Sequence, residues 1–342
     1  MWYGVQVQEE LKIAGLMFNW MPSWWYRNYG IEYGRRMYFD PDYRVETYLR
    51  KERLIHQRYA PMPVGQADPQ PVSLMPDFQN PVTALAAGAA VRYPADNYPA
   101  NDHLPEARIR ALALPDDLSQ VFPYSEIDRQ AAYLNARLGR HDLPWWNVRG
   151  AQNDAVLIRG SDFFGDYYAD PGLARHLLDW TSGMLERIVR RNHAVGHRGM
   201  VCITNCTVMM VSPRLYDEWL LPYDRQVNEL ALGFGQEFGI HHCGRADDYL
   251  DCYRRLPRVD FLEIGTGSDI ARVLGAFPRA RVQIILSASF VANASLNDVR
   301  REIDRVLAAA EGNWPRFSLA MPDVEYGTPD ENLLEIWRCC RR

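Results

Sequence analysis

The chain has 342 residues, of which 47% are hydrophobic and 24% charged, and its net charge is −5 at pH 7. These proportions are typical of a globular protein that buries its core without disulfide bonds. The acidic balance leaves no basic stripe for binding nucleic acid. No apolar run reaches the roughly 18 residues that a membrane-spanning helix needs. Residues 1–16 lack the apolar stretch of a signal peptide, so we expect a cytoplasmic protein without nucleic-acid or membrane partners.

Lysine and cysteine usage argues against two further classes of chemistry. Lys12 and Lys51 are the only lysines, and neither stands in the Gly-Lys-Ser/Thr context of a phosphate-binding loop. Both are flanked by polar or charged residues, which disfavours the desolvated amine that Schiff-base chemistry requires. The six cysteines are too few for a disulfide framework in a chain of this length. We expect them to be free thiols or metal ligands.

The N-terminal part of the chain is rich in aromatic residues. We interpret residues 1–65 as an extension or lid, because such aromatic density is typical of a lid or an interface core. Turn-forming residues fill 61–81, a short helix of small residues is expected over 84–91, and 93–115 is predicted to be a long loop. Pro115-Asp116-Asp117 begins the next helical pattern.

The second half alternates between apolar strands and amphipathic helices about every 20 to 30 residues. Asp170-Pro171 and Ser295 mark two of the helix starts. Alternation of this kind indicates βαβ units and a parallel sheet. Strands are predicted at 200–204, 240–243, 259–264, 282–286 and 316–320, and helices at 171–191, 214–238, 247–256, 269–275, 295–310 and 329–339.

A single α/β domain over residues 1–342 fits this pattern, as a (β/α)₈ TIM barrel with an aromatic-rich N-terminal extension. The alternative is an open, doubly wound sheet, which normally carries a glycine fingerprint after an early strand. Gly265-Thr266-Gly267 follows a predicted strand, but Ile270 stands where the third glycine belongs. The sequence therefore favours the barrel, whose catalytic residues lie at the carboxyl ends of the strands.

The strongest local signal is Ile240-His241-His242-Cys243-Gly244. Successive side chains of a strand alternate between its two faces, so His241 and Cys243 point to the same side. Imidazole and thiolate together favour zinc. The glycine and the polar residues after it indicate a loop at the barrel mouth. The alternative is a structural histidine beside a buried, unreactive cysteine.

From this motif outward the sequence resembles the uroporphyrinogen decarboxylase superfamily, and within it the corrinoid-dependent zinc methyltransferases. The resemblance covers residues 70–335, and it is more specific for the superfamily than for one reaction. The segments that carry it are Ser73-Leu74-Met75-Pro76-Asp77-Phe78, Ala87-Gly88-Ala89-Ala90-Val91-Arg92, Leu157-Ile158-Arg159-Gly160-Ser161-Asp162-Phe163-Phe164, Asp170-Pro171, Ser212-Pro213-Arg214-Leu215-Tyr216-Asp217-Glu218, Leu221-Pro222-Tyr223, His241-His242-Cys243-Gly244 and Gly327-Thr328-Pro329-Asp330-Glu331-Asn332.

The resemblance implies a (β/α)₈ barrel in which a His-x-Cys pair and a later cysteine bind zinc. His241 and Cys243 match the first two ligands. The third position falls near Met321-Pro322-Asp323, where no cysteine stands. We therefore expect an oxygen ligand, either from Glu263 at a predicted strand end or from Asp323.

Three further residues are candidate catalytic groups. Asn205 follows a predicted strand and should face the barrel mouth. Asp77 resembles a pocket-facing carboxylate, and His242 lies between the two expected zinc ligands. For Asn205 and Asp77 the alternative is a purely structural role in a turn.

The resemblance implies a methyltransferase that uses zinc to activate a thiol. The methyl group would be exchanged with a corrinoid, free or carried on a partner protein. The other expected partner is a small-molecule substrate, and a homodimer is left open. One alternative is a decarboxylase in which Arg27 and its neighbours hold carboxylates and Asp77 stabilises a protonated intermediate. Another is a non-catalytic barrel that binds a small molecule or a corrinoid.

Overall fold

The centre of the protein is a curved parallel sheet. This computed structural model describes residues 3–5, 10–72, 78–146 and 148–342. Six neighbouring strands pair in parallel, and one further strand, β1, pairs antiparallel with β2 at the edge. In spatial order the strands are β1 (Tyr3–Val5), β2 (Gly15–Trp20), β9 (Phe317–Val324), β8 (Arg281–Ile285), β7 (Phe261–Gly265), β6 (Phe238–His242) and β5 (Val201–Thr204).

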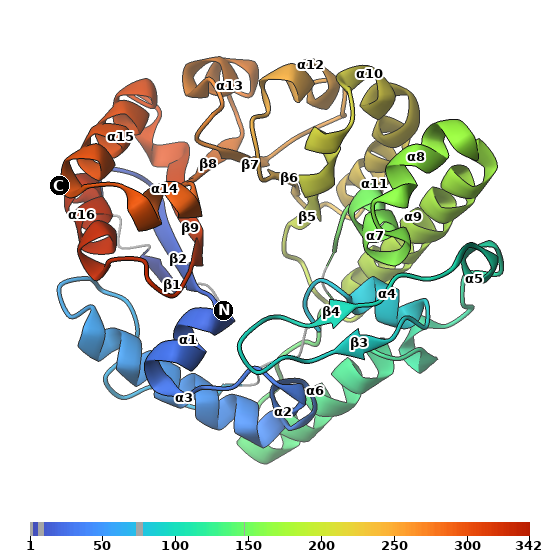
Figure 1. Cartoon of the computed structure of the whole chain (residues 1–342), viewed down its shortest axis with the longest axis horizontal. Coiled ribbons are helices and arrows are strands. Elements are labelled where there is room, and N and C mark those ends of the chain that lie inside the picture. The colour runs from blue at the N-terminus through green and yellow to red at the C-terminus, as the bar shows by residue number, and fades with distance from the viewer. Residues whose placement is uncertain (1–2, 6–9, 73–77, 147) are drawn as a thin grey trace.

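Helices surround this sheet on its outer side. In Figure 1 the strands line the inner side of a ring of helices, and helices and loops fill the arc between β5 and β2. The predicted α/β class with a parallel sheet is confirmed, as a six-stranded half-barrel. The helices are α1 (Pro22–Tyr29), α2 (Arg35–Phe39), α3 (Pro41–Arg58), α4 (Val82–Ala86), α5 (Glu106–Arg110), α6 (Tyr124–Leu138), α7 (Ala151–Arg159), α8 (Asp162–Ala169), α9 (Pro171–Ala194), α10 (Pro213–Leu215), α11 (Leu221–Gly233), α12 (Leu250–Tyr253), α13 (Ile270–Ala276), α14 (Ala288–Asn293), α15 (Leu296–Ala309) and α16 (Asp330–Cys340).

Shorter elements connect the helices and strands. A small ribbon pairs β3 (Val91–Arg92) with β4 (Ala100–Asn101). A π-helical turn at Tyr216–Leu220 joins α10 to α11. Single 3₁₀ turns lie at 118–120, 206–210, 247–249 and 314–316.

Several helix starts lie where the sequence predicts them. The Asp170 carboxylate accepts a hydrogen bond from the Leu173 amide (3.0 Å) at the start of α9. The Ser295 hydroxyl accepts one from the Asp298 amide (3.2 Å) at the start of α15. Such side-chain caps satisfy backbone donors that the helix leaves free, which is why these residue types predict helix starts.

One predicted helix is too long. The sequence suggested a helix over 214–238, but α11 ends at Gly233 and β6 begins at Phe238. Gly235 has a φ of 71°, a conformation that ends a helix and that glycine adopts without strain. The apolar run from Phe238 to Ile240 is buried and belongs to strand β6, and periodicity alone does not separate such a run from a buried helix.

The N-terminal aromatic segment differs from the predicted extension. The strand β2 is part of the parallel sheet, where Leu16 pairs with Leu319 of β9. Trp20 is only 1% exposed, and its indole Nε1 donates to the Tyr59 hydroxyl (3.1 Å). These aromatic side chains therefore build the core of the half-barrel rather than a detachable lid.

Lys51 also differs from its sequence context. Its flanking charges suggested a solvated amine, but the residue is only 6% exposed. The ammonium lies 4.6 Å from the centre of the Trp25 ring and 5.0 Å from that of Tyr33. Burial lowers the pKa of Lys51 to about 7, because desolvation disfavours the charged form.

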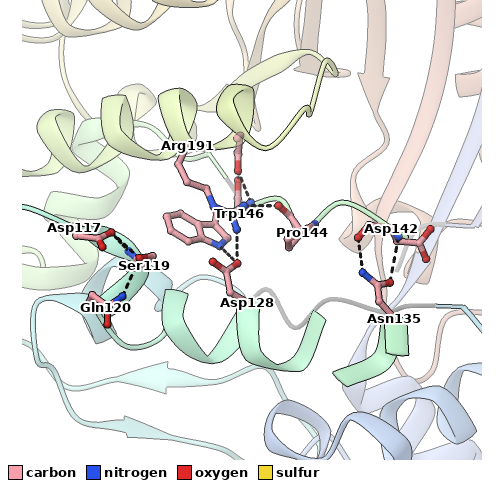
Figure 2. A network of polar contacts seen from close by, with 10 residues as sticks. Asp117, Ser119, Gln120, Asp128, Asn135, Asp142, Pro144, Trp146 and Arg191 are labelled. Atoms are coloured by element: carbon pink, nitrogen blue, oxygen red, sulfur yellow. Dashed lines mark hydrogen bonds and ion pairs between the residues drawn. The ribbon is translucent and has the colours of Figure 1, made fainter. Parts of the chain in front are cut away.

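The loop between α6 and α7 is tied to its neighbours by polar contacts (Figure 2). The Trp146 indole donates to Asp128 (3.0 Å), and Arg191 of α9 contacts both Asp128 and the Pro144 carbonyl. Trp146 also lines a cavity of about 290 Å³ together with Met200 at the amino-terminal side of β5. This cavity lies away from the carboxyl ends of the strands, where barrels of this type place their chemistry.

Candidate metal centre

Neighbouring strands place a row of polar side chains inside the half-barrel. His241 of β6 pairs with Thr204 of β5 on one side and with Glu263 of β7 on the other. Glu263 in turn pairs with Gln283 of β8. Residues paired across a parallel sheet project to the same face. The sheet register therefore brings His241 and Glu263 together at the carboxyl side of the strands.

Three potential metal ligands converge at this position. The ligand atoms of Cys206, His241 and Cys243 all lie within 4.8 Å of one another. The His241 Nε2 atom is 2.9 Å from the Cys243 Sγ atom. Cys206 comes from the turn that directly follows β5. It was not among the ligands expected from the sequence.

Glu263 lies behind His241 rather than among these three. Its carboxylate contacts the Nδ1 atom of His241, while Nε2 faces the thiols. A carboxylate on one ring nitrogen fixes the orientation of the imidazole and makes the other nitrogen a better metal ligand. Direct coordination by Glu263 or Asp323 remains a prediction.

The three groups share protons in the metal-free protein. The pKa of Cys206 falls to about 4, chiefly because Cys243 donates a hydrogen bond to its thiolate, and His241 adds to this effect. The same bond raises the pKa of Cys243, as does burial. Burial opposes charge on His241, but its contacts with Cys206 and Glu263 outweigh burial and raise its pKa to about 10. A bound metal would displace the protons on His241 and Cys243, since metals bind the deprotonated forms.

The turn that carries Cys206 is fixed from two sides. The Asn205 amide donates to the His241 carbonyl (2.7 Å). The Thr207 amide donates to the Asn153 side chain (2.9 Å), which belongs to α7. These two bonds attach the turn that presents the Cys206 thiol to β6 and to α7.

These donors fit a zinc ion. Two thiolates and one imidazole are the protein ligands of a known class of catalytic zinc site, which leaves the fourth position open. Zinc–sulfur bonds of about 2.3 Å place neighbouring ligand atoms about 3.5 to 3.8 Å apart in a tetrahedron. The observed spread of up to 4.8 Å needs only small side-chain rotations to reach that arrangement.

Two candidate catalytic residues lie on the opposite side of the strands. The Asn205 side chain donates to Asp224 (2.7 Å). Both ring nitrogens of His242 are engaged, one by the Tyr253 hydroxyl (2.8 Å) and one by the Arg245 carbonyl (3.2 Å). The structure therefore does not bring Asn205 or His242 into the row that contains His241.

The two remaining acidic candidates differ in how well they are placed. Asp323 lies on β9 within electrostatic range of His241 and Cys206, and desolvation raises its pKa. Asp77 lies outside the described residues. Arg27, which the decarboxylase alternative would use to hold carboxylates, is at the surface. The side chain of Arg27 is 59% exposed and lies 3.9 Å from Asp96.

A sequence signal for Cys206 did exist. Its segment Asn205-Cys206-Thr207 directly follows one predicted strand, and the His-x-Cys motif ends the next. Carboxyl ends of consecutive parallel strands meet at the same edge. The family resemblance instead predicts the third ligand near residues 321–323.

Comparison with known proteins agrees with this architecture. Residues 78–342 match the uroporphyrinogen decarboxylase (URO-D) family. The chain belongs to this family, and the matched span includes Cys206, His241, Cys243 and Glu263. Comparison with curated protein sequences gives no match.

Two solved structures place the fold in context. A methyltransferase from Methanosarcina mazei is 14% identical with a TM-score of 0.64, and the alignment covers 94% of this chain and 90% of that one. The 3-keto-D-glucoside 4-epimerase YcjR from E. coli is 13% identical with a TM-score of 0.34, covering 62% of this chain and 84% of that one. The first similarity shows a shared fold. Across the described residues, no helix combines the length and the apolar character needed to cross a bilayer.

Proposed function

We propose that the protein is a zinc-dependent methyltransferase that transfers a methyl group between a corrinoid and a thiol. The observation that carries this proposal is the convergence of Cys206, His241 and Cys243 at the carboxyl side of β5 and β6. The proposal includes a closed (β/α)₈-type barrel, with the elements between β5 and β2 completing the ring. The three converging side chains also favour a metal enzyme over a non-catalytic barrel.

Each residue of the site has a distinct task in this proposal. Cys206, His241 and Cys243 would hold the metal, and Glu263 would keep the His241 Nε2 atom directed at it. A bound zinc ion would leave one position for a substrate thiol and lower the pKa of that thiol, so that it reacts as a thiolate. Asp323, whose pKa is raised, would accept the thiol proton at the exposed rim of the site.

The methyl donor is suggested by the similar fold and by the site's surroundings. The similar structure from Methanosarcina mazei is named a methyltransferase. Met209 and Met210 follow Cys206 in the same turn and are 47% and 67% exposed. An exposed apolar rim suits a large, partly apolar ligand such as a corrinoid.

Metal analysis of the purified protein tests the proposal. We expect close to one zinc per chain, and we expect Cys206→Ser or Cys243→Ser to weaken zinc binding at least tenfold, because each removes a thiolate ligand. Cys202→Ser is the matched control, since Cys202 lies on β5, close to Cys206 in sequence, but outside the cluster. Full zinc occupancy in the Cys206→Ser, His241→Ala double variant would show that the metal is bound elsewhere. A metal-free wild-type protein that cannot be loaded would reject the zinc mechanism.

A further inference from the structure

A buried polar cluster lies behind the candidate metal centre, on the helix-facing side of β5 and β6. We call it the anchoring cluster. All five of its residues are at most 4% exposed. Its members are Asn205, Tyr216, Asp224, His242 and Tyr253.

Hydrogen bonds connect the cluster to the turn after β5. Asp224 accepts from the Asn205 side chain (2.7 Å) and from the Tyr216 hydroxyl (2.6 Å) through the same carboxylate oxygen. Tyr216 belongs to the π-helical turn that precedes α11. Such turns are rare within helices and often occur at functional sites. Here the turn places the Tyr216 hydroxyl against the Asp224 carboxylate, which also accepts from Asn205, the residue before Cys206.

The same cluster holds the end of β6. Because the Arg245 carbonyl can only accept, His242 Nε2 carries the proton, and Nδ1 accepts from the Tyr253 hydroxyl (2.8 Å). The Tyr253 ring packs edge-on against Tyr216, with 5.5 Å between the ring centres. The Tyr253 hydroxyl also interacts with Asn205. One network therefore holds residues from both strand ends.

The positions of Asn205 and His242 decide what this network does. Asn205 precedes Cys206, and His242 stands between His241 and Cys243. Neighbouring residues in a strand point to opposite faces, so anchoring His242 on the outer face fixes His241 and Cys243 on the inner face. Asn205 directly precedes the turn that begins at Cys206, so anchoring Asn205 fixes the start of that turn.

We propose that Asp224 and Tyr253 are positioning residues that set the separation between Cys206 and the His241–Cys243 pair. A metal site needs its ligands placed within about 0.5 Å. Rotating any member of the network out of place leaves a buried donor or acceptor unpaired, which opposes the movement. The inference rests on the proposed zinc site, but the spacing of the two thiols is tested below with and without a metal.

The test compares three variants of buried acidic residues. Asp224→Leu keeps the branched shape of the side chain but removes the acceptor for both Asn205 and Tyr216. Asp224→Asn retains an acceptor oxygen and should rescue the site. Asp166→Leu is the control for lost stability. Asp166 is a buried acid on α8, outside the cluster, and it pairs with Arg159 of α7 (2.9 Å).

Cobalt(II) binding and the absorption spectrum of the cobalt site are the first readout. We expect wild type and Asp166→Leu to show the strong absorption of a four-coordinate, thiolate-ligated ion. Asp224→Leu should bind cobalt at least tenfold more weakly with weaker absorption, while Asp224→Asn should stay within about threefold of wild type.

Binding of phenylarsine oxide to the metal-free protein is the second readout, because this reagent bridges two close thiols. Asp224→Leu should lose the binding that depends on Cys206 and Cys243, with Cys243→Ser as the blank. If wild type binds no metal, the zinc proposal fails, but phenylarsine oxide binding still decides whether Asp224 positions the two thiols.

Folded Asp224→Leu that binds both probes like wild type would overturn the inference. An equal loss in Asp166→Leu would overturn it too. If Asp224→Leu does not fold, Tyr253→Phe decides, with a smaller loss in the same direction expected.

Discussion

At the scale of single residues, the contact between Glu263 and His241 controls how the site can work. A neutral imidazole has one protonated and one free nitrogen, and a carboxylate on Nδ1 selects the form in which Nε2 is free to bind a metal. Glu263 is only 6% exposed, so water competes poorly for its carboxylate. In the proposed zinc site, Glu263 would therefore influence the metal through His241 without having to touch it.

Removing this carboxylate should weaken metal binding. We expect Glu263→Ala to lower zinc affinity by about 10- to 100-fold, because His241 then loses its fixed orientation. Glu263→Gln keeps a hydrogen-bonding group and should lose less. Competition with a chromophoric chelator measures both, with Asp323→Asn as the comparison. A larger loss in Asp323→Asn than in Glu263→Ala would mean that Asp323 is itself a ligand.

Residue-level reasoning from the sequence found part of this site. The pairing of His241 with Cys243 follows from strand periodicity alone, and Glu263 was identified from its position at a strand end. Cys206 was missed as a candidate ligand, because it follows the strand end in a turn whose geometry no periodicity describes. Asn205 and His242 lie beside the ligands in sequence but on the other face, where one residue of offset reverses the direction of a side chain.

At the scale of elements, the turn after β5 depends on its close contact with the start of α7. The Gly150 amide donates to the Thr204 carbonyl (3.1 Å). A Cβ atom at Gly150 would lie 2.3 Å from that carbonyl oxygen and 2.6 Å from the Asn205 side chain. The nearer neighbour is backbone, and the Asn205 side chain is held in place by its hydrogen bond to Asp224 (2.7 Å), so glycine is required for this approach.

Gly150→Ala should therefore destabilise the protein and disturb the turn. We expect a loss of about 1 to 3 kcal/mol in the free energy of unfolding from the forced backbone shift, together with weaker zinc binding. Gly275→Ala is the matched control, since that glycine lies in α13 with open space at its Cβ position. It should be neutral or stabilising by about 0.5 to 1 kcal/mol. Urea unfolding measures both, and equal effects would contradict the close-contact argument.

Element types were more predictable than their ends. Strands β5 to β9 and helices α9, α13, α15 and α16 lie close to the predicted ranges, because each combines a clear apolar pattern with a capping or turn residue. The end of α11 was misplaced, since the run at Phe238 suits a buried helix as well as a buried strand. Tertiary pairing with β5 and β7 decides between them.

The buried carboxyl of Asp224 gives the folded protein a pH-dependent stability. Burial raises the pKa of Asp224 to about 6, although the Tyr216 and Asn205 donors act in the opposite direction. A carboxyl with a raised pKa in the folded state binds a proton there more tightly than in the unfolded chain. Its ionisation therefore costs stability above about pH 6, by up to about 3 kcal/mol, and this cost disappears below its unfolded pKa of about 4.

Comparison with Asp224→Asn isolates this contribution. In metal-free protein, the free energy of unfolding of wild type relative to Asp224→Asn should rise as the pH falls from 7 to about 4.5. The facing groups Tyr216 and Tyr253 do not titrate in this window, because burial raises the pKa of both. A pH-independent difference between the two proteins would mean that Asp224 titrates normally.

At the scale of the whole molecule, residues from the two ends of the chain pack against each other. Arg58 of α3 forms an ion pair with Asp330 of α16 (2.8 Å). The Tyr59 hydroxyl donates to the same carboxylate (2.5 Å) and accepts from the Trp20 indole (3.1 Å). This contact joins β2, the end of α3 and the start of α16 in one partly buried junction.

Tyr59→Phe tests how much this junction contributes. The substitution removes the hydroxyl that accepts from the Trp20 indole and takes one donor from Asp330. We expect a loss of about 1 to 3 kcal/mol in the free energy of unfolding. Tyr326→Phe, at a residue that is 59% exposed, should change it by less than about 0.5 kcal/mol. Indistinguishable denaturation curves for the two variants would show that the junction is not a stabilising contact.

The pairing of β2 with β9 also constrains how the protein is made. Asn19 donates to the Pro322 carbonyl (2.8 Å) across 303 residues of chain, and Figure 1 shows the two strands side by side. On a ribosome that adds about 5 to 20 residues per second, roughly 15 to 60 seconds pass between the synthesis of β2 and that of its partner β9. During that time Phe18 and Trp20 have no sheet to cover them. The nascent chain should therefore need a chaperone at its amino-terminal segment until β9 has emerged.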